Sequence, residues 1–274
     1  MKHVKITFLT MLWGKKYPVE YVNNLYNGIA RNTNYNFDFV CMTDQPSEYF
    51  REGIKLMDFY RDPYQNGWWT KLDMFRGDLP IVGKIVYLDL DMVIVGNIDW
   101  IFENANGDDD ILLLPDAVPK NLYNSSFVKF TSGKHSYIIE NSHLLDGEDI
   151  SLSYEEERFG DKKYWGDQIW MSEQMVLNRP NNIFTVPDGS IKSLKFELGG
   201  VDNFKGYGEE TSIILFTGDP LPHEAYKLKE VFNSWVGDVV IKRNRERVSV
   251  MRNEDLIMRS LASRGVTYWY VEDL

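Results

Sequence analysis

The sequence predicts an α/β domain with a central, mostly parallel sheet that is flanked by helices. Through the first hundred of its 274 residues, apolar segments of strand length alternate with segments of helical spacing. The strand segments are apolar throughout, without polar alternation, which is typical of strands buried on both faces. A chain of this length buries about three quarters of the surface of its unfolded form, so it needs no disulfide or metal to fold.

The first half, residues 1–100, begins with a β-rich apolar run at 4–10. Gly14 and Pro18 follow it, and then apolar residues at 22, 25, 26 and 29 have the spacing of one helix face. The other elements predicted in this half are strands at 37–43, 54–59 and 85–88 and a short amphipathic helix at 68–75. This alternation indicates a Rossmann-type nucleotide-binding half.

The second half, residues 101–235, is less regular. Strands are predicted at 110–114, 127–130, 183–186 and 211–216, and helices at 135–145 and 168–176. The segment 146–163 is rich in Asp and Glu and is expected to form a solvated loop or a mobile flap. No repeat or low-complexity linker divides the chain, so we expect one domain over 1–274, with 236–274 as a C-terminal extension.

The charge of the chain limits its partners. With 30 basic and 41 acidic side chains, the formal net charge is −11, which repels nucleic acid and anionic membranes. A negatively charged substrate therefore needs a cation to mediate its binding. The single cysteine, Cys41, cannot form an intramolecular disulfide, and no segment approaches the roughly 20 apolar residues of a membrane span. We expect a cytoplasmic protein with no signal peptide, no transmembrane segment and no nucleic-acid partner.

Two carboxylates follow the predicted strand at 85–88. Asp89 and Asp91 lie two residues apart in the apolar run 85–95, so their side chains project from the same face. Open α/β sheets bind their ligands at the carboxyl ends of strands. Two like charges in an apolar run are unfavourable unless a cation or strong donors compensate them. A hard divalent ion, Mn²⁺ or Mg²⁺, is the natural compensation.

Other short motifs lie on both sides of these carboxylates. In chain order they are the segment 10–17, Trp68-Trp69-Thr70-Lys71-Leu72, Val95-Gly96-Asn97-Ile98, Asn124-Ser125-Ser126-Phe127, Trp165-Gly166-Asp167-Gln168, and the segment 216–223. Together with Tyr87-Leu88-Asp89-Leu90-Asp91, they resemble motifs of family 8 glycosyltransferases and related bacterial polysaccharide transferases, in the expected order. The resemblance spans about 4–235 and implies the GT-A fold, a Rossmann-like architecture in which 1–100 bind the nucleotide and 101–235 bind the donor sugar and the acceptor.

The resemblance also implies a role for each candidate residue. Asp89, Asp91 and His223 would hold the metal, and Asp167 and Gln168 would be the catalytic pair that faces the sugar. The donor-binding residues would be Thr10, Trp13, Tyr17, Lys71, Asp89, Leu90, Asn124, Ser125 and Gly218. Among them, Tyr17 or Trp13 would stack on the base, Lys71 would contact a phosphate or the donor sugar, and Asn124 and Ser125 would bind sugar hydroxyl groups.

Several of these residues have a structural explanation as well. Trp13 and Tyr17 suit a core equally well, and Asp167 suits the N-cap of a helix that starts at Gln168. Asn124 suits an Asx-type turn, and a lysine on an amphipathic helix is usually a solvated charge.

Two positions depart from the family pattern. Leu215 stands where the family commonly has a metal-binding histidine, and His223 is the candidate replacement; its structural explanation is a surface histidine that caps the following helix. Leu221 stands where a lysine usually contacts the diphosphate, so that charge is missing or comes from elsewhere.

These expectations combine into a metal-dependent hexosyltransferase that moves a sugar from a nucleotide-sugar donor, a UDP-sugar by resemblance, to a carbohydrate or glycoconjugate acceptor with retention. Two alternatives stay open. Asp89-Leu90-Asp91-Met92-Val93 also resembles the nucleophile motif of haloacid-dehalogenase-type phosphatases, in which Asp89 would be the nucleophile, although that motif normally opens its fold. Leu215 and Leu221 leave room for a noncatalytic nucleotide-sugar-binding protein.

The run Lys242-Arg243-Asn244-Arg245-Glu246-Arg247 is a basic cluster ahead of an aromatic segment at 268–270. Such a charge run is most often a solvated face. Its functional interpretations are guidance of an anionic acceptor or self-association into a homo-oligomer.

Overall fold

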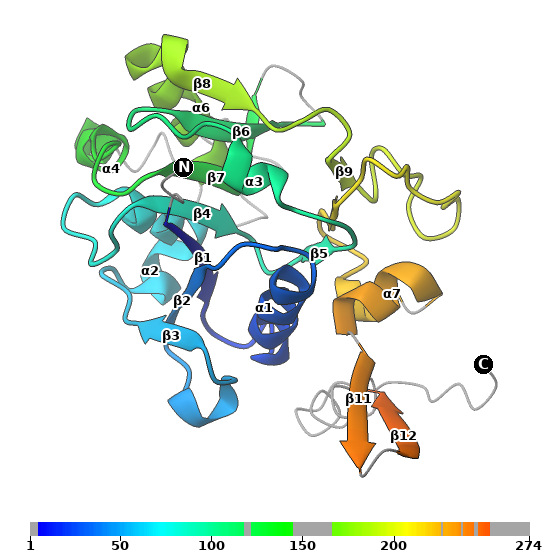
Figure 1. Ribbon diagram of the computed structural model, residues 1–274. Helices are drawn as coiled ribbons and strands as arrows, with labels where there is room; N and C mark the ends of the chain where they lie inside the picture. The colour runs from blue at the N-terminus through cyan, green and yellow to red at the C-terminus, as the bar shows by residue number, and fades with distance from the viewer. Residues whose placement is uncertain are drawn as a thin grey trace.

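Seven strands form the central sheet of the computed structural model, which describes residues 5–117, 122–144, 166–225, 227–236, 238–243 and 246–252 (Figure 1). Their spatial order is β3 (Ile54–Met57), β2 (Asp38–Thr43), β1 (Ile6–Leu12), β4 (Lys84–Leu88), β7 (Tyr123–Thr131), β6 (Ile111–Pro115) and β8 (Ile183–Thr185). Neighbouring strands are parallel except at β7, which runs antiparallel to β4 and β6. The mostly parallel sheet predicted from the sequence is confirmed.

Both faces of the sheet are apolar, which explains why the strand segments show no polar alternation. Every residue of β1 is buried. Phe8 and Leu12 pack into the apolar layer on one face, and Leu9 and Met11 pack into the layer on the other. Alternate side chains of a strand point to opposite faces, so a strand covered on both sides carries apolar residues toward both faces; in β1 only Thr7 and Thr10 are polar, and both are buried.

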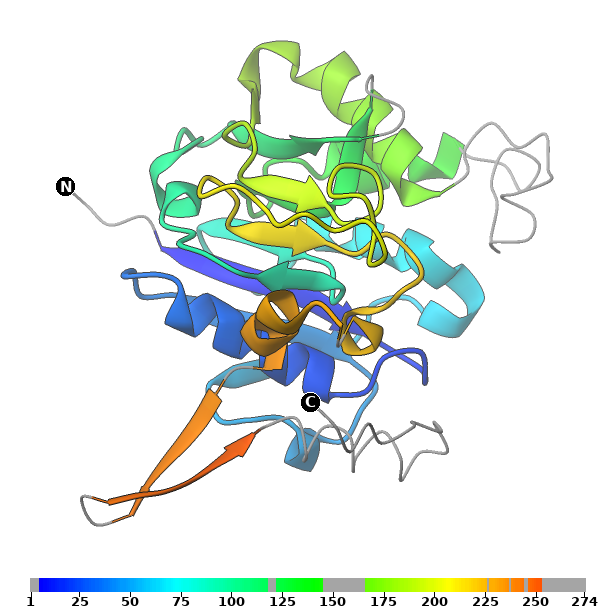
Figure 2. The same cartoon turned by 90° about the vertical axis from the view of Figure 1, so that its right-hand side faces the viewer.

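Helices cover the two faces. On one face α1 (Glu20–Arg31) packs beside α7 (Lys229–Val236) and a small sheet of β5 (Met92–Ile94), β10 (Ile213–Leu215) and β9 (Ile191–Ser193) (Figure 2). The other face carries the 3-10 helix η2 (Gly67–Phe75), preceded by α2 (Pro63–Asn66), together with α4 (Tyr137–Glu140) and α6 (Asp167–Asn178). The remaining short elements are η1 (Ser47–Tyr49), α3 (Trp100–Glu103), η3 (Asn141–Leu144), η4 (Pro180–Asn182) and η5 (Pro222–Glu224).

The segment predicted as an amphipathic helix at 68–75 is a 3-10 helix, and the solvent-facing side expected of it is absent. All residues from Trp69 to Phe75 are buried, Lys71 and Asp73 included. The interpretation of Lys71 as a solvated charge is therefore wrong. Because η2 packs against α4, α6 and the sheet, its polar residues must find partners inside the protein.

The other differences concern the ends of elements and very short strands. The predicted helix at 135–145 is split into α4 and η3, with residue 145 outside the described residues. The three-residue strands β5 and β9 were not predicted, because a run of three apolar residues is too short to show a period. The acidic segment 146–163 also lies outside the described residues. Of the extension 236–274, the structure describes Val236 and the hairpin strands β11 (Asp238–Arg243) and β12 (Glu246–Arg252).

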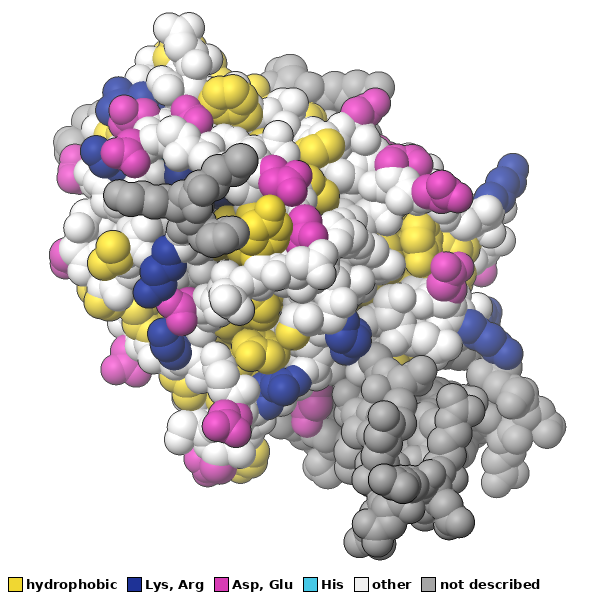
Figure 3. All heavy atoms as spheres, viewed as in Figure 1, with side chains coloured by type: hydrophobic (Ala, Val, Ile, Leu, Met, Phe, Trp, Pro, Cys, Tyr) yellow, Lys and Arg dark blue, Asp and Glu magenta, His cyan; other side chains and the backbone are white. Residues whose placement is uncertain are grey.

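The surface of the described residues carries charges of both signs. On the face drawn in Figure 3, acidic, basic and apolar side chains are interspersed. Among the described helices, none has both the length and the hydropathy that a membrane span requires.

Arg61 anchors η2 through a buried carboxylate. Its Nε donates to Asp73 Oδ1 at 2.7 Å, and its Nη2 donates to the carbonyl oxygen of Trp69 at 2.7 Å. The Asp73 side chain is completely buried, and burial raises its pKa against the opposing attraction of Arg61. The ion pair therefore fixes the turn of η2 that carries Lys71.

We expect Arg61→Met to lower the free energy of unfolding by about 3 kcal/mol, because it leaves the buried Asp73 carboxylate without its charged partner. Urea denaturation measures the loss. The matched control is Lys192→Met, which removes an ion pair to the exposed Glu210 and should change stability little. Equal losses in the two variants would show that Arg61 does not anchor η2.

His135 provides a second test of the fold. Its side chain is completely buried, its Nδ1 lies 3.3 Å from Tyr137 Oη, and its Nε2 has no hydrogen-bond partner among the described residues. Burial, with the charges of Arg179 and Lys84, lowers the pKa of His135 from 6.5 to about 4. The unfolded chain thus binds a proton near pH 6.5 that the folded chain does not bind until about pH 4.

The contribution of the neutral His135 to the free energy of unfolding is fully present above pH 6.5, and it falls as the pH drops from 6.5 toward 4. Relative to His135→Asn, the wild type should lose about 2 kcal/mol of unfolding free energy between pH 7 and pH 5. Urea denaturation of both proteins at each pH measures this change. Between pH 7 and pH 8.5 the difference between the two proteins should stay constant, and a constant difference down to pH 5 would contradict the buried neutral imidazole.

Candidate active site

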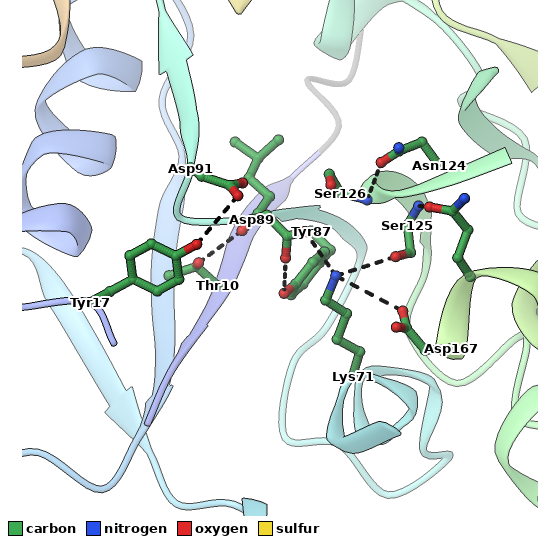
Figure 4. Close-up of polar contacts among 12 residues, drawn as sticks. Thr10, Tyr17, Lys71, Tyr87, Asp89, Asp91, Asn124, Ser125, Ser126 and Asp167 are labelled. Atoms are coloured by element: carbon green, nitrogen blue, oxygen red, sulfur yellow. Dashed lines mark hydrogen bonds and ion pairs between the residues drawn. The ribbon is translucent and has the colours of Figure 1, made fainter. Parts of the chain in front are cut away.

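The two carboxylates of the Asp-x-Asp motif lie where four strands end near one another. β4 runs directly into Asp89, whose backbone N–H donates to Ser126 O of β7 at 3.0 Å. The backbone N–H of Phe216, which follows β10, donates to Asp91 O at 3.1 Å. Thr10 of β1 donates its hydroxyl to Leu88 O at 2.8 Å, and this bond is buried. Hydrogen bonds to the backbone therefore fix the motif on several sides, and Figure 4 shows the one from Thr10.

Asp89 accepts a hydrogen bond at each carboxylate oxygen. Tyr87 Oη donates to Oδ1 at 2.7 Å, and Lys71 Nζ donates to Oδ2 at 2.8 Å (Figure 4). Tyr87 lies on β4, two residues before Asp89, so both side chains point to the same side of the strand. Lys71 comes from η2 on that face of the sheet. The strong donors that the sequence required near this pair of carboxylates are therefore present.

Lys71 joins the Asp-x-Asp motif to the second half of the site. Its ammonium lies 2.8 Å from Asp89 Oδ2 and 3.9 Å from Asp167 Oδ2, and it donates to Ser125 Oγ at 3.3 Å. Burial lowers the pKa of Lys71, but the carboxylates of Asp89 and Asp167 outweigh burial and hold it above its ordinary value. Lys71 is therefore charged and is the cation between these two carboxylates.

Asp91 is the less saturated carboxylate of the motif. Its Oδ2 accepts a bond from Tyr17 Oη at 3.4 Å, and its buried Oδ1 has no hydrogen-bond partner among the described residues. Burial and the negative charge of Asp89 raise the pKa of Asp91 to about 7. A half-buried carboxylate whose open oxygen is itself buried favours binding of a cation, because a cation compensates both the burial and the repulsion from Asp89.

Asp89 and Asp91 fit Mn²⁺ or Mg²⁺ as part of a ligand set that oxygens of the donor and of water would complete. Such ions are held by one or two carboxylates together with phosphate and water oxygens, and dedicated protein cages are uncommon. Asp91 offers an open oxygen and Asp89 lies two residues away in the same motif. Within the part of the chain that the structure describes, no three His, Cys, Asp or Glu side chains are grouped closely enough to hold an ion by themselves.

His223 is connected to Asp91 through two tyrosines, Tyr21 and Tyr17. It is buried in η5, and its Nδ1 is hydrogen bonded to Tyr21 Oη. The centroids of the Tyr21 and Tyr17 rings lie 4.9 Å apart, and Tyr17 Oη donates a hydrogen bond to Asp91 Oδ2. Burial lowers the pKa of His223. His223 is thus not the surface histidine of its structural explanation, and its role as a metal ligand stays a prediction.

Asp167 is the first residue of α6, and Gly166 is the N-cap. The interpretation of Asp167 as the N-cap is therefore wrong, and its side chain faces Lys71 across 3.9 Å (Figure 4). Burial raises the pKa of Asp167, with Lys71 opposing and Asp89 adding to the shift. Asp167 and Asp89 hence lie on two sides of one ammonium.

Asp116 was not among the candidate residues, yet it orients two of them. Its Oδ2 accepts from Gln168 Nε2 at 2.6 Å, and its Oδ1 accepts from Asn124 Nδ2 at 3.3 Å. Gln168 Oε1 in turn accepts from the Ser125 backbone N–H at 3.2 Å. Asp116 follows β6 beyond any motif of the sequence, so only the pairing of β6 with β7 shows its role. A recess beside it is lined by residues that include Ser193, Glu197 and Thr217.

Asn124 forms the Asx-type turn of its structural explanation, and its role in binding sugar hydroxyl groups stays a prediction. Its Oδ1 accepts from the Ser126 N–H at 2.9 Å, which is the Asx-type turn, and its Nδ2 is held by Asp116. The turn places Ser125 toward Lys71 (Figure 4).

The remaining candidates do not join this network through contacts in the structure. Half-buried Trp13 packs edge-on against Phe59 at 6.1 Å. Leu90 is buried in the apolar core. Gly218 has φ of 72°, a left-handed conformation that favours glycine, and no atom would contact a Cβ there. A role in donor binding stays a prediction for each of these three residues.

No family model and no curated protein matches the chain. Solved structures do. The glycosyltransferase GlyE of Streptococcus pneumoniae TIGR4 superposes with a TM-score of 0.52 at 15% identity, over 99% of this chain and 67% of GlyE. Its apo form gives 0.56, also at 15% identity, over 99% of this chain and 66% of that chain. The chain thus spans about two thirds of the length of GlyE.

The galactosyltransferase LgtC, solved with donor and acceptor sugar analogs, gives a TM-score of 0.57 at 11% identity over 87% of this chain and 98% of its own. At these identities the likeness concerns the fold. The chain has the GT-A-like fold of these glycosyltransferases, as the resemblance of its motifs implied.

Proposed function

We propose that the protein is a metal-dependent glycosyltransferase that moves a hexosyl group from a nucleotide sugar to a carbohydrate or glycoconjugate acceptor. One observation carries the proposal: Lys71 joins the Asp-x-Asp carboxylate Asp89 to Asp167 at the carboxyl ends of the strands, in a fold shared with glycosyltransferases. In an open α/β sheet this edge is where ligands bind. UDP as the nucleotide and retention of configuration follow from the motif resemblance.

The chain's own residues divide the chemistry between two regions. Asp91 and Asp89 would hold Mn²⁺ or Mg²⁺ together with oxygens of the donor. When bound, the ion supplies positive charge that stabilises the diphosphate leaving group as the C1–O bond breaks. Tyr17, hydrogen bonded to Asp91 on the other side of the motif, offers an aromatic plane for the base.

Asp167 and Gln168 stand on the other side of Lys71. A carboxylate there can stabilise an oxocarbenium-like state of the sugar or bind its hydroxyl groups. Gln168 is held by Asp116 and by the Ser125 N–H, so its amide orientation is fixed. The recess beside Asp116 lies next to Asn124 and is the place we assign to the acceptor.

The phosphatase alternative has less support from the position of the motif. Its nucleophile would be Asp89, and the motif follows the fourth strand of the chain, after β1, β2 and β3, whereas in that family it opens the fold. The alternative of a noncatalytic binding protein is tested by assaying turnover of the nucleotide sugar, because such a protein would bind the donor without releasing the nucleotide. Location in the cytoplasm and homo-oligomer formation stay predictions of the sequence.

The donor test is a thermal melt with UDP, GDP and a panel of nucleotide sugars, each with Mn²⁺ or with EDTA, and with released nucleotide assayed in the same samples. We expect the melting temperature to rise with UDP and Mn²⁺, because a ligand of the native state stabilises it, and we expect EDTA to abolish the rise. Asp91→Asn should weaken metal-dependent UDP binding by more than about 100-fold.

The control for Asp91→Asn is Asp188→Asn, which changes an exposed carboxylate in the turn before β9 and should bind UDP as the wild type does. Hydrolysis of a simple phosphate ester, with no shift from any nucleotide, would favour the phosphatase and overturn the proposal.

Asp167→Asn should separate binding from chemistry. The amide keeps the shape of the side chain but removes the negative charge, so nucleotide affinity should stay within about threefold while turnover falls by roughly 100- to 1,000-fold. Nucleotide release from the donor identified above measures turnover, and the anomeric configuration of the product, read by NMR, tests retention. Nearly normal turnover in this variant would show that Asp167 takes no part in the reaction.

A further inference from the structure

We propose that Lys16, in the loop between β1 and α1, binds the diphosphate of the nucleotide donor and supplies the positive charge for which Leu221 provides none. The inference rests on the proposed function, because it assigns a contact within the same donor site. Its starting point is the charge balance of that site.

The site is rich in carboxylates, and its buried cation is already engaged. The candidate site contains three carboxylates, those of Asp89, Asp91 and Asp167. The Lys71 ammonium is within ion-pair distance of Asp89 and Asp167. A diphosphate brings further negative charge into this region. Lys71 cannot turn fully toward a phosphate without leaving the half-buried Asp89 and the buried Asp167 without their cation, which is costly. Besides a divalent ion, a donor of this kind therefore needs a second, uncommitted cation.

Lys16 is placed to be that cation. Its Nζ lies 5.0 Å from the centroid of the Tyr17 ring, and Tyr17 Oη reaches Asp91 Oδ2. The charge of Lys16 also acts on Asp91, where it partly offsets the rise in pKa caused by burial and by Asp89. Lys16 thus lies on the side of the motif where the open oxygen of Asp91 and the aromatic ring of Tyr17 are found.

The Lys16 side chain is exposed, and among the described residues no carboxylate lies within ion-pair distance of its ammonium. A lysine on a flexible four-carbon stem can move its charge by several bond lengths at little cost. Pairing with phosphate oxygens therefore breaks no existing ion pair.

The loop that carries Lys16 is anchored at its start. The Gly14 N–H donates to Asp44 Oδ2 at 3.4 Å, and Gln45 Nε2 donates to Gly14 O at 3.3 Å. Tyr64 Oη donates to the same Asp44 oxygen at 2.5 Å. The backbone near Lys16 is thus held beside the end of β2, while the Lys16 side chain is exposed.

The chain offers a matched control in the neighbouring Lys15. It is also exposed and lies in the same loop, but among the described residues its ammonium lies over no aromatic ring of the site. Lys16→Met keeps the aliphatic stem that can cover Tyr17 and removes only the charge. Lys15→Met makes the same change one residue away.

The test measures affinity by calorimetry at constant Mn²⁺ for UDP and GDP, with uridine and guanosine as counterparts that lack the diphosphate. For the diphosphate that binds the wild type, Lys16→Met should weaken affinity about tenfold, as expected for one charged hydrogen bond, and should leave the nucleoside unaffected. Lys15→Met should bind as the wild type does, and Lys16→Arg should retain most of the affinity. Added salt should weaken diphosphate binding more in the wild type than in Lys16→Met.

Each contrary outcome has a distinct meaning. If the wild type binds a nucleoside diphosphate and Lys16→Met binds it equally well, the Lys16 assignment is wrong while the proposed function stands. If Lys16→Met weakens nucleoside and diphosphate equally, the residue acts through the Tyr17 side of the site and not on phosphate, which also overturns the inference. A wild type that binds neither diphosphate overturns the proposed function and this inference with it.

Discussion

The ion pairs of Lys71 are the interaction on which the candidate site depends. A buried ammonium is unfavourable by itself, and so are two buried carboxylates that face each other. With Lys71 between Asp89 and Asp167, each charge compensates the others, and the three side chains can occupy one buried region. Tyr87 and Ser125 satisfy further oxygen and nitrogen positions of the same group. Remove the lysine, and the two halves of the site lose their electrostatic connection.

The rest of the fold serves to place these charges. The apolar run of β4 buries the strand between β1 and β7 and delivers Asp89 and Asp91 at its carboxyl end. η2, held by Arg61 and Asp73, brings Lys71 to the same place from the helical layer. α6 begins at Asp167 on that face. The segments that meet here are far apart in the chain, and each is positioned by its own apolar packing against the sheet.

The departures at Leu215 and Leu221 each have a consequence for the charges of the site. Leu215 is buried in β10 and belongs to the apolar core, where an imidazole would have needed a polar partner. Asp91 is left with an open carboxylate oxygen, while the nearest histidine of the candidate set is held by Tyr21. At Leu221 the chain lacks a cation, whereas the two lysines of the β1–α1 loop, Lys15 and Lys16, are exposed.

The sequence by itself determined the fold class and the shared face of Asp89 and Asp91, because both are local patterns. Uninterrupted apolar strands require cover on both faces, and Asp89 and Asp91 share a face through the period of a strand. What only the tertiary structure decided are the relations between distant segments: Lys71 buried and not solvated, Gly166 and not Asp167 as the N-cap of α6, and Asp116 as the partner of Gln168 and Asn124. The physical reason is that burial and charge pairing depend on neighbours from other segments. A sequence period shows which side of an element a residue occupies, but only packing shows what that side faces.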